Sequence, residues 1–220
     1  MKIVIIGSGN VAYHLAKAFT QNSIEVSQIF GRNEVELNKI SEELNIPYST
    51  KELADADLYL ISVSDSAVEQ VSDLIKTEKA LVAHTSGSLP IETLNGDYRK
   101  ASFYPLQTFS KTKNLDYSKI PFFIEAENQI DEKSLFELAS LISDNVETSD
   151  YEKRKYIHLT AVFACNFVNH LFARAKEISD SQDLDFNYFI PLIDETVEKI
   201  HHLEPKSAQT GPAVRGDERV

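Results

Sequence analysis

A glycine turn near the start of the chain constrains the fold more than any other stretch. It follows residues 2–6, a β-branched apolar run that predicts a strand buried on both faces of a parallel sheet. The turn, residues 7–12, reads Gly-Ser-Gly-Asn-Val-Ala and has the spacing G-x-G-x-x-A. Residues 10–21 then carry the apolar periodicity of an amphipathic helix. A strand, this turn and a helix in direct succession are typical of a dinucleotide-binding domain.

The residues of the turn have separate predicted tasks. Gly7 permits the tight turn, Gly9 lets a pyrophosphate approach the backbone, and Ala12 lets the helix pack closely on the strand. The unpaired N–H groups at the start of the helix would then face the phosphates. The predicted phosphate-binding residues are Gly7, Ser8, Gly9, Asn10 and Val11.

The segment after the second predicted strand favours NADP(H) over NAD(H) as the cofactor. This strand, residues 24–30, is followed by Gly31-Arg32-Asn33. In an NAD-binding domain an acidic residue here holds the ribose 2′-hydroxyl. Arg32, with Asn33 beside it, instead suits a 2′-phosphate, because a guanidinium binds phosphate through two donors. A solvated loop arginine would look the same in the sequence, but the glycine turn upstream favours the NADP(H) interpretation.

Strands and helices alternate through the first two thirds of the chain. Strands are predicted at residues 2–6, 24–30, 46–48, 58–63 and 80–84, with helices at 10–21, 34–44, 51–54 and 67–76. This alternation predicts an α/β fold, a Rossmann-type doubly wound parallel sheet. Further strands at 102–109, 122–125 and 146–148 and a helix at 131–143 complete a dinucleotide-binding domain that we expect to comprise residues 1–149.

Ligands of such sheets bind beyond the carboxyl ends of the strands. Polar segments lie there after the fourth and fifth strands, and Ser64-Asp65-Ser66 also suits the N-cap of the next helix. The predicted cofactor-binding residues of these segments are Val63, Ser64, Asp65, Thr85 and Ser86. Ser86 is in addition a catalytic candidate. Candidates for the substrate end are Ser88, Pro105 and Gln107.

The last third of the chain shows no strand pattern. We expect residues 150–220 to form an all-α substrate and dimerisation domain. Residues 151–180 predict one helix, about 45 Å long at 1.5 Å per residue, and residues 185–203 predict a second helix with Pro191 as a kink. The middle of the long helix is apolar on nearly every side and needs cover on both flanks. One cover is the first domain, and the other could be the rest of the helical domain or a second subunit. We expect a homodimer through this domain.

Three polar residues interrupt the apolar middle of the long helix. His158, Asn166 and Asn169 have the spacing i, i+8, i+11, which places them on one α-helical stripe about 80° wide. Two interpretations stay open. The side chains could satisfy each other or backbone groups across helices. Alternatively, the stripe faces the nicotinamide, with His158 as proton donor, Asn166 orienting a substrate carbonyl and Asn169 lining the cleft.

Charge, hydropathy and cysteine content narrow the class of protein. The net charge is -12, from 34 acidic and 22 basic residues, which argues against a nucleic-acid or anionic-membrane partner. No apolar run reaches the ~20 residues that span a bilayer. Cys165 is the single cysteine, so we expect no internal disulfide and a reducing, cytoplasmic compartment. The histidines show no metal-ligand spacing, and no metal is expected.

The chain resembles a group of bacterial Rossmann-like NADP oxidoreductases whose C-terminal half is an all-α domain of unassigned function. The matching stretches are IIGSGNVAYHLAKAF, SVSD, HTSGSLP, FYPLQTFS, HLTAVFACNFVNHL and TGPAVRGD. It is also similar to deazaflavin-dependent NADP reductases, pyrroline-5-carboxylate reductases and β-hydroxyacid dehydrogenases, with a helical half like the C-terminal domain of 6-phosphogluconate dehydrogenase. The resemblance implies NADP(H) binding, a helical dimerisation domain and an active site between the two domains.

The sequence departs from these relatives in two ways. β-Hydroxyacid dehydrogenases carry a lysine one turn before an asparagine of the long helix, whereas Val162 precedes Asn166 here and Cys165 precedes Asn169. The usual lysine chemistry is therefore not expected. Similar chains also continue past the last matching stretch, which leaves two alternatives: a truncated helical domain, or a disordered end that this sequence omits. Arg215, in an Arg-Gly-Asp triplet whose likeness to an adhesion motif is coincidental, is expected to bond within a turn near an active site, its own or a partner's.

Two functions fit these residues. The first is an NADP(H)-dependent oxidoreductase that transfers a hydride to or from a C=O or C=N bond of a small metabolite. The second is a non-catalytic NADP-binding sensor or scaffold. The glycine turn and Arg32 fit both, but the polar helix stripe and the segment 84–88 favour the enzyme, because a sensor needs no polar lining at the reactive end. A methyltransferase is a weaker third hypothesis, since it usually has an acidic residue after the second strand.

Overall fold

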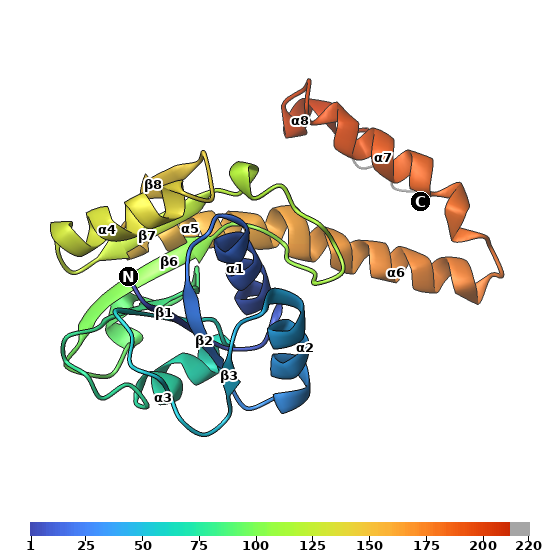
Figure 1. The fold of residues 1–220 in the computed structure, drawn as a ribbon. Coiled ribbons are helices and arrows are strands. Elements are labelled where there is room, and N and C mark those ends of the chain that lie inside the picture. The colour runs from blue at the N-terminus through green and yellow to red at the C-terminus, as the bar shows by residue number, and fades with distance from the viewer. Residues whose placement is uncertain (212–220) are drawn as a thin grey trace. The chain divides into compact units, whose positions relative to one another are not determined.

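The protein consists of two compact units, Met1–Cys165 and Asn166–Val220. A computed structural model describes residues 1–211 (Figure 1). This division falls after the first helix of the all-α segment. The domain boundary expected at residue 149, directly after the last strand, stays a prediction. None of the helices in residues 1–211 is both long enough and apolar enough to cross a membrane.

The first unit is built on an eight-stranded sheet with the order β3-β2-β1-β4-β5-β6-β7-β8. The strands are β1 (Ile3–Ile6), β2 (Val26–Phe30), β3 (Tyr48–Ser49), β4 (Leu58–Ile61), β5 (Leu81–His84), β6 (Arg99–Pro105), β7 (Phe122–Ala126) and β8 (Val146–Thr148). All neighbouring strands are parallel except β6 and β7, which are antiparallel. The sheet confirms the predicted α/β Rossmann-type class. It differs from a fully parallel sheet in the antiparallel pairing of β6 and β7.

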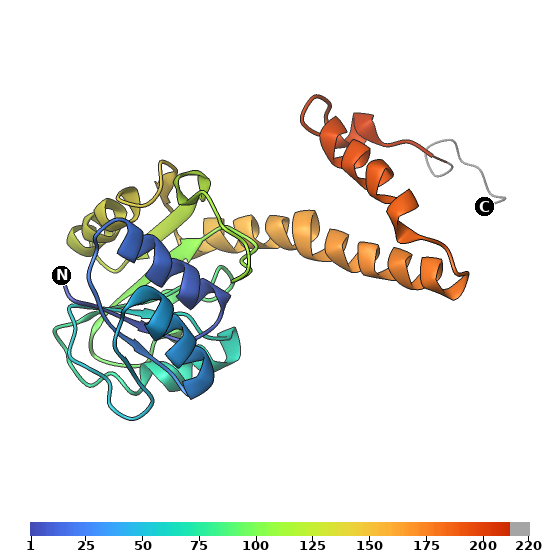
Figure 2. The same cartoon turned by 45° about the vertical axis from the view of Figure 1, so that its right-hand side comes forward.

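Helices cover both faces of this sheet. They are α1 (Asn10–Gln21), α2 (Glu34–Leu44), α3 (Val68–Ser72), α4 (Gln129–Ser140) and α5 (Tyr151–Ala161). Short 3₁₀ turns lie at Asp65–Ala67, Ile91–Thr93 and Tyr117–Lys119. Ile3 and Ile5 of β1 contribute to the core that also holds residues of α1, α2 and α4, whereas Val4 and Ile6 contribute to the core that holds Val68 of α3. Because both faces are buried, the central strands are apolar without interruption; α1 and α2 lie side by side in blue in Figure 2.

Two helices predicted in the first unit are wrong or too long. Residues 51–54 are not helical, because side chains satisfy their backbone: Ser49 Oγ accepts the N–H of Lys51 and of Glu52. The helix predicted at 67–76 is reduced to α3. Ser72 Oγ donates to the Glu69 carbonyl oxygen, and such local side-chain bonds compete with continuation of a helix.

The long helix predicted at residues 151–180 is not a single α-helix. A π-helical segment, Val162–Phe167, follows α5 and precedes α6 (Val168–Ser181). The second unit also contains a 3₁₀ turn at Phe186–Tyr188, α7 (Ile190–Lys199) and α8 (Pro205–Ala208). Pro191 does not kink a helix, as predicted, but lies in the first turn of α7. A proline is compatible with that position because its missing N–H has no partner there in any helix.

Candidate active site

The two glycines of the β1 turn face different surroundings. Gly7 has a φ of +137°, and a Cβ atom there would lie 2.2 Å from the Ser62 carbonyl oxygen. Its N–H donates to the Phe30 carbonyl oxygen at 2.8 Å. A Cβ atom on Gly9 would meet no atom within 4 Å. The fold thus requires glycine at position 7, whereas Gly9 borders open space from which a ligand can approach the backbone.

The start of α1 fits the pyrophosphate of a dinucleotide. Gly9 is the N-cap residue, no side chain caps the first turn, and the first turn contains no acidic residue. The Asn10 side chain donates instead to the Phe109 carbonyl oxygen at 2.9 Å. Val11 is half-buried against the core and Ser8 is half-buried at the turn. The N–H groups of this turn are therefore available to an anion, which the positive end of the helix dipole also favours.

Arg32 and Asn33 take different positions after β2. Arg32 is exposed, and within residues 1–211 its side chain has no hydrogen bond or ion pair. Asn33 is the N-cap of α2, and its Oδ1 accepts the N–H of Glu36 at 3.2 Å. Arg32 is consequently the residue of this pair whose donors are available to a 2′-phosphate, whereas Asn33 is engaged in starting the helix.

The segments after β4 and β5 are joined by a cluster of hydroxyl groups. Thr85 Oγ1 donates to Ser62 Oγ at 3.4 Å. Ser86 Oγ lies 3.2 Å from Ser88 Oγ, and Ser88 Oγ also donates to Asp65. Three predicted site residues, Asp65, Ser86 and Ser88, thus meet at this edge of the sheet. Val63 is half-buried and Ser64 exposed; Ser64 makes no side-chain capping bond, contrary to the N-cap prediction.

His158 lies against the turn that follows β5. A Cβ atom on Gly87 would lie 2.8 Å from His158 Cγ and 2.6 Å from Tyr104 Cζ. His158 Nδ1 is 3.0 Å from the Tyr104 hydroxyl oxygen, and the two rings meet edge to face. The histidine predicted from the helical half is therefore held at the carboxyl edge of the sheet, where β6 ends.

Tyr104 keeps its proton at neutral pH. Burial raises the pKa of its hydroxyl to about 12, and Asp65 adds to the rise while the Arg154 charge opposes it. A neutral phenol can either donate to His158 Nδ1 or accept from it. Tyr104 therefore orients the imidazole in either protonation state and leaves Nε2 as the nitrogen without a hydrogen bond among residues 1–211.

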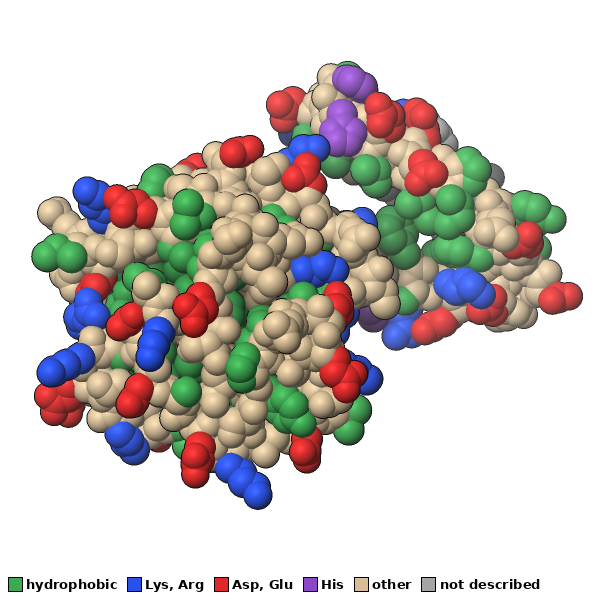
Figure 3. All heavy atoms as spheres, viewed as in Figure 1, with side chains coloured by type: hydrophobic (Ala, Val, Ile, Leu, Met, Phe, Trp, Pro, Cys, Tyr) green, Lys and Arg blue, Asp and Glu red, His purple; other side chains and the backbone are tan. Residues whose placement is uncertain are grey.

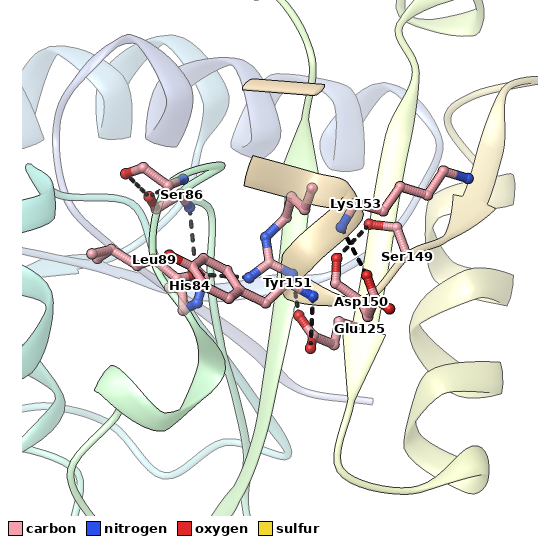
Figure 4. Close-up of polar contacts among 10 residues, drawn as sticks. His84, Ser86, Leu89, Glu125, Ser149, Asp150, Tyr151 and Lys153 are labelled. Atoms are coloured by element: carbon pink, nitrogen blue, oxygen red, sulfur yellow. Dashed lines mark hydrogen bonds and ion pairs between the residues drawn. The ribbon is translucent and has the colours of Figure 1, made fainter. Parts of the chain in front are cut away.

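Arg154 anchors α5 one turn before His158. It is fully buried, forms an ion pair with Glu125 of β7, and donates to the Leu89 carbonyl oxygen at 2.6 Å. Figure 4 labels these two partners. Glu125 also accepts the N–H of Tyr151 at 3.2 Å. A buried guanidinium needs such partners, because an unpaired charge in the interior is costly. These contacts fix the start of α5 and hence the position of the His158 ring.

His84, at the end of β5, is a neutral buried histidine. Its Nδ1 accepts the N–H of Ser86 at 3.2 Å (Figure 4), so Nε2 carries the hydrogen. Burial lowers its pKa to about 4, and the Arg154 charge adds to this, against the opposing effects of the Pro90 carbonyl and Asp65. Among residues 1–211, Nε2 has no partner with hydrogen-bond geometry. His84 shapes the turn that carries Ser86 and does not act as an acid near neutral pH.

The other predicted residues have different surroundings. Pro105 is buried at the end of β6, and Gln107 is exposed, with its Oε1 accepting the Thr108 N–H. Asn166 and Asn169 are exposed in the second unit, and the π-helical segment Val162–Phe167 changes the α-helical spacing on which the predicted stripe was based. The roles predicted for the two asparagines stay predictions. Arg215 lies outside the described residues. Within residues 1–211 no metal-binding group of histidine, cysteine, aspartate or glutamate occurs.

Sequence reasoning missed Tyr104, Arg154, Glu125 and His84 as members of the site. One signal was present: Arg154 precedes His158 by four residues, which places both on one face of a helix. A buried arginine on the same face as a candidate acid would have indicated an anchored helix. Tyr104 gave no such signal, since its partner is 54 residues away in the chain.

Comparison with known proteins assigns the chain to a family. Residues 2–87 match the model of the coenzyme F420-dependent NADP oxidoreductases, and residues 120–220 match a domain of unknown function, DUF2520. A Bacteroides fragilis protein described as a proposed NADP oxidoreductase is 43% identical, with a TM-score of 0.92 over 99% of this chain and 86% of that one. This chain belongs to the same family of NADP oxidoreductases. The expected resemblance and its cofactor, NADP(H), are thereby confirmed at the level of the family.

More distant structures share the fold of this NADP oxidoreductase. A Thermotoga maritima protein is 22% identical, with a TM-score of 0.82 over 98% of this chain and 86% of that one. A 1-pyrroline-5-carboxylate reductase of Streptococcus pyogenes is 16% identical, with a TM-score of 0.68 over 100% of this chain and 85% of that one. No curated protein matches the chain significantly.

Proposed function

We propose that this NADP oxidoreductase transfers a hydride between NADP(H) and a C=O or C=N bond of a small metabolite. The observation that carries the proposal is the Tyr104–His158 pair, whose hydroxyl oxygen and Nδ1 are 3.0 Å apart. Both side chains pack against Gly87, at the edge of the sheet where dinucleotides bind in Rossmann domains. The glycine turn and Arg32 would hold the pyrophosphate and the 2′-phosphate. The nicotinamide supplies the hydride chemistry when it is bound.

In the direction of reduction the chain must supply one proton for each hydride. Protonated His158 can give that proton from Nε2 to the oxygen or nitrogen of the substrate, while Tyr104 accepts a hydrogen bond from Nδ1. The neutral ring then regains a proton from water. In the direction of oxidation the same nitrogen takes the proton away. Tyr104 and Arg154 are positioning residues in this scheme, since they orient and anchor the ring.

The pyrroline-5-carboxylate reductases among the structural neighbours support our proposal of a small C=N or C=O compound as the substrate. A shared fold does not identify the compound, so the proposal rests on the residues of the site. The cluster of Asp65, Ser86 and Ser88 places a carboxylate and two hydroxyls beside the Tyr104–His158 pair. These groups suit a substrate that offers hydrogen-bond donors as well as an acceptor. We propose that Ser86 contacts the substrate or the nicotinamide ribose from this position.

We further propose that the protein is a homodimer through its helical segment. Several large apolar side chains of the second unit are more than 60% exposed, and Figure 3 shows hydrophobic side chains gathered on its helices. They are Leu171, Ile178, Tyr188 and Leu192. Apolar patches of this kind usually mark an interface between proteins. Light scattering should show a dimer at micromolar concentration; a monomer would contradict this part of the proposal.

The experiment that tests the proposal separates binding from turnover. Calorimetry should first show that the protein binds NADP+ and NADPH. A panel of small carbonyl and cyclic imine metabolites is then followed by NADPH absorbance, with crystals grown in NADP+ and the same panel. At least one compound should be reduced. Absence of NADP(H) binding would overturn the proposal, and tight binding with no turnover and no bound compound would favour the sensor hypothesis instead.

A further inference from the structure

The loop after β6 is fastened to the start of α1. In this loop, residues 106–116, the Phe109 carbonyl oxygen accepts from Asn10 Nδ2 at 2.9 Å. The carbonyl oxygen of Ser110 lies 2.8 Å from Nε2 of the buried His14 and accepts its hydrogen. Two bonds from one helix hold the loop beside the glycine turn. The loop backbone is thereby fixed at the point from which the next residue, Lys111, extends.

Lys111 bridges the turn after β1 and the helix after β2. Its Nζ donates to the Ser8 carbonyl oxygen at 2.8 Å and forms an ion pair with Glu36, in the first turn of α2. The side chains of Lys111 and Glu36 are 26% and 29% exposed, so the pair is half-buried yet open to solvent. In a Rossmann domain the adenosine ribose lies between these two turns. The ammonium group is thus held at the ribose end of the predicted cofactor site, beside the Arg32-Asn33 segment.

The chemistry of this position suits a second phosphate-binding cation. A 2′-phosphate carries close to two negative charges and three acceptor oxygens, more than one exposed arginine neutralises. The ammonium group has three donors, of which Ser8 and Glu36 engage two. Glu36 stays ionised at neutral pH, because its bonds to Lys111 and Lys39 lower its pKa to about 2. Its carboxylate therefore competes with a phosphate for Lys111.

We propose that Lys111 is a specificity-determining residue that contacts the 2′-phosphate of NADP(H). Glu36 and the phosphate compete for the Lys111 ammonium group. The inference rests on the proposed function only for the identity of the cofactor and not for the substrate. With NAD(H), which lacks the phosphate, Lys111 stays on Glu36 and contributes little to affinity. With NADP(H), the ammonium is shared with the phosphate. Preference for NADP(H) then depends on a residue about 80 positions beyond the Arg32 segment.

Calorimetry with four probes tests the role of Lys111 without any substrate. The probes are NADP+ and 2′,5′-ADP, which carry the 2′-phosphate, and NAD+ and 5′-AMP, which lack it. Lys111→Met should weaken binding of the first two by about tenfold, the size expected for one charge-assisted contact, and change the last two less than twofold. Glu36→Gln should tighten binding of the first two by about threefold. Lys113→Met, an exposed lysine of the same loop, is the matched control and should change nothing.

The outcomes distinguish this inference from the proposed function. Equal losses for NADP+ and NAD+ in Lys111→Met would show that the lysine only supports the glycine turn through Ser8, and would overturn the inference. Unchanged NADP+ affinity, or weaker binding in Glu36→Gln, would overturn it too while the proposed function stands. A wild-type protein that binds neither NADP+ nor NADPH would overturn both. Melting temperatures of all variants are measured, so that a loss of fold is recognised as such.

Discussion

The turn after β1 takes its predicted phosphate-binding groups from one short stretch of chain, whereas the end of β6 gathers Tyr104, His158 and Arg154 from two distant elements. At β1 the groups are backbone N–H donors, whose positions follow from the strand, the turn and the helix alone. At β6 they are side chains held by an ion pair to β7 and a hydrogen bond to residue 89. The first end depends on local geometry and the second on tertiary packing. Substitutions should therefore affect the two ends separately.

The largest expected effect concerns turnover at the β6 end. His158→Ala should lower the rate for any substrate found by about 10²–10⁴-fold, the usual contribution of a general acid. NADP+ affinity should stay within about twofold, because the contacts proposed for the cofactor's phosphates lie at the β1 turn and not at His158. Tyr104→Phe keeps the ring but loses the bond to Nδ1, and its loss should be smaller. A large drop in melting temperature with a normal rate would instead assign both residues a purely structural role.

Loss of the buried anchor should cost stability. Arg154→Met leaves Glu125 without its charged partner, and we expect the free energy of unfolding to fall by about 3–5 kcal/mol in urea titrations. Arg174→Met is the matched control. That arginine pairs with Glu177 on an exposed helix surface, and its loss should cost less than about 1 kcal/mol. If Arg154→Met lowered the free energy of unfolding no more than Arg174→Met, the conclusion that tertiary packing holds the residues at the end of β6 would be wrong.

The two glycines of the β1 turn should separate binding from folding. Gly9→Val should weaken NADP+ binding by at least about 100-fold without changing the melting temperature, since its side chain meets open space in the free protein. Gly7→Ala should lower the free energy of unfolding by about 2 kcal/mol, because φ is +137° and the new atom meets Ser62. Normal NADP+ affinity in folded Gly9→Val would place the phosphate site elsewhere.

The free energy of unfolding should also fall in acid, because His84 is buried in its neutral form. Its pKa is about 4 in the folded protein and 6.5 in the unfolded chain, so the unfolded state binds more protons between these values. The stability that depends on neutral His84 is fully present above pH 6.5 and is lost as the pH falls towards 4. Wild type should lose about 2 kcal/mol from this group by pH 5. His84→Gln should flatten that part of the profile; an unchanged slope would assign it to other groups.

The smallest expected effect lies at the ribose end. Arg32→Asp should lower NADP+ affinity by about tenfold, because a phosphate contact is replaced by repulsion between like charges. NAD+ affinity should hold or rise, since a carboxylate can accept from the ribose 2′-hydroxyl. Calorimetry on both cofactors checks this. Equal affinity of the wild type for NADP+ and NAD+ would contradict the role given to Arg32.

Local pattern accounts for what the sequence predicted correctly. The strands β1 and β4 are apolar and buried on both faces, and α1 and α2 begin and end at the predicted residues, because periodicity and turn chemistry lie within each segment. The glycine turn was predictable for the same reason. The failures occurred where other contacts decided: residues 51–54 are held by side-chain bonds, and Pro191 starts α7 rather than kinking it.

The reactive end could be predicted only in part. His158 stood out as a polar residue in an apolar helix, but its partner Tyr104 was one aromatic residue among many in a predicted strand. Lys111 had the appearance of a solvated loop lysine, and its contact with Glu36 spans 75 positions. Periodicity carries no information on which distant side chains meet. The roles of Asn166 and Asn169 stay predictions, and the π-helical segment that alters their spacing cannot be recognised from apolar periodicity.

The buried Arg154 has a consequence for how the protein opens by thermal fluctuation. Its contacts with Glu125 and Leu89 mean that α5 cannot leave the sheet without exposing a charged pair that only the intact edge satisfies. Amide protons of α5 should therefore exchange with solvent at the same slow rate as those of β6 and β7, because one cooperative opening exposes all three elements. The compact unit extends to Cys165 rather than ending with β8, in agreement with such coupling. Hydrogen exchange read by mass spectrometry would then show α5 and the sheet edge as one foldon.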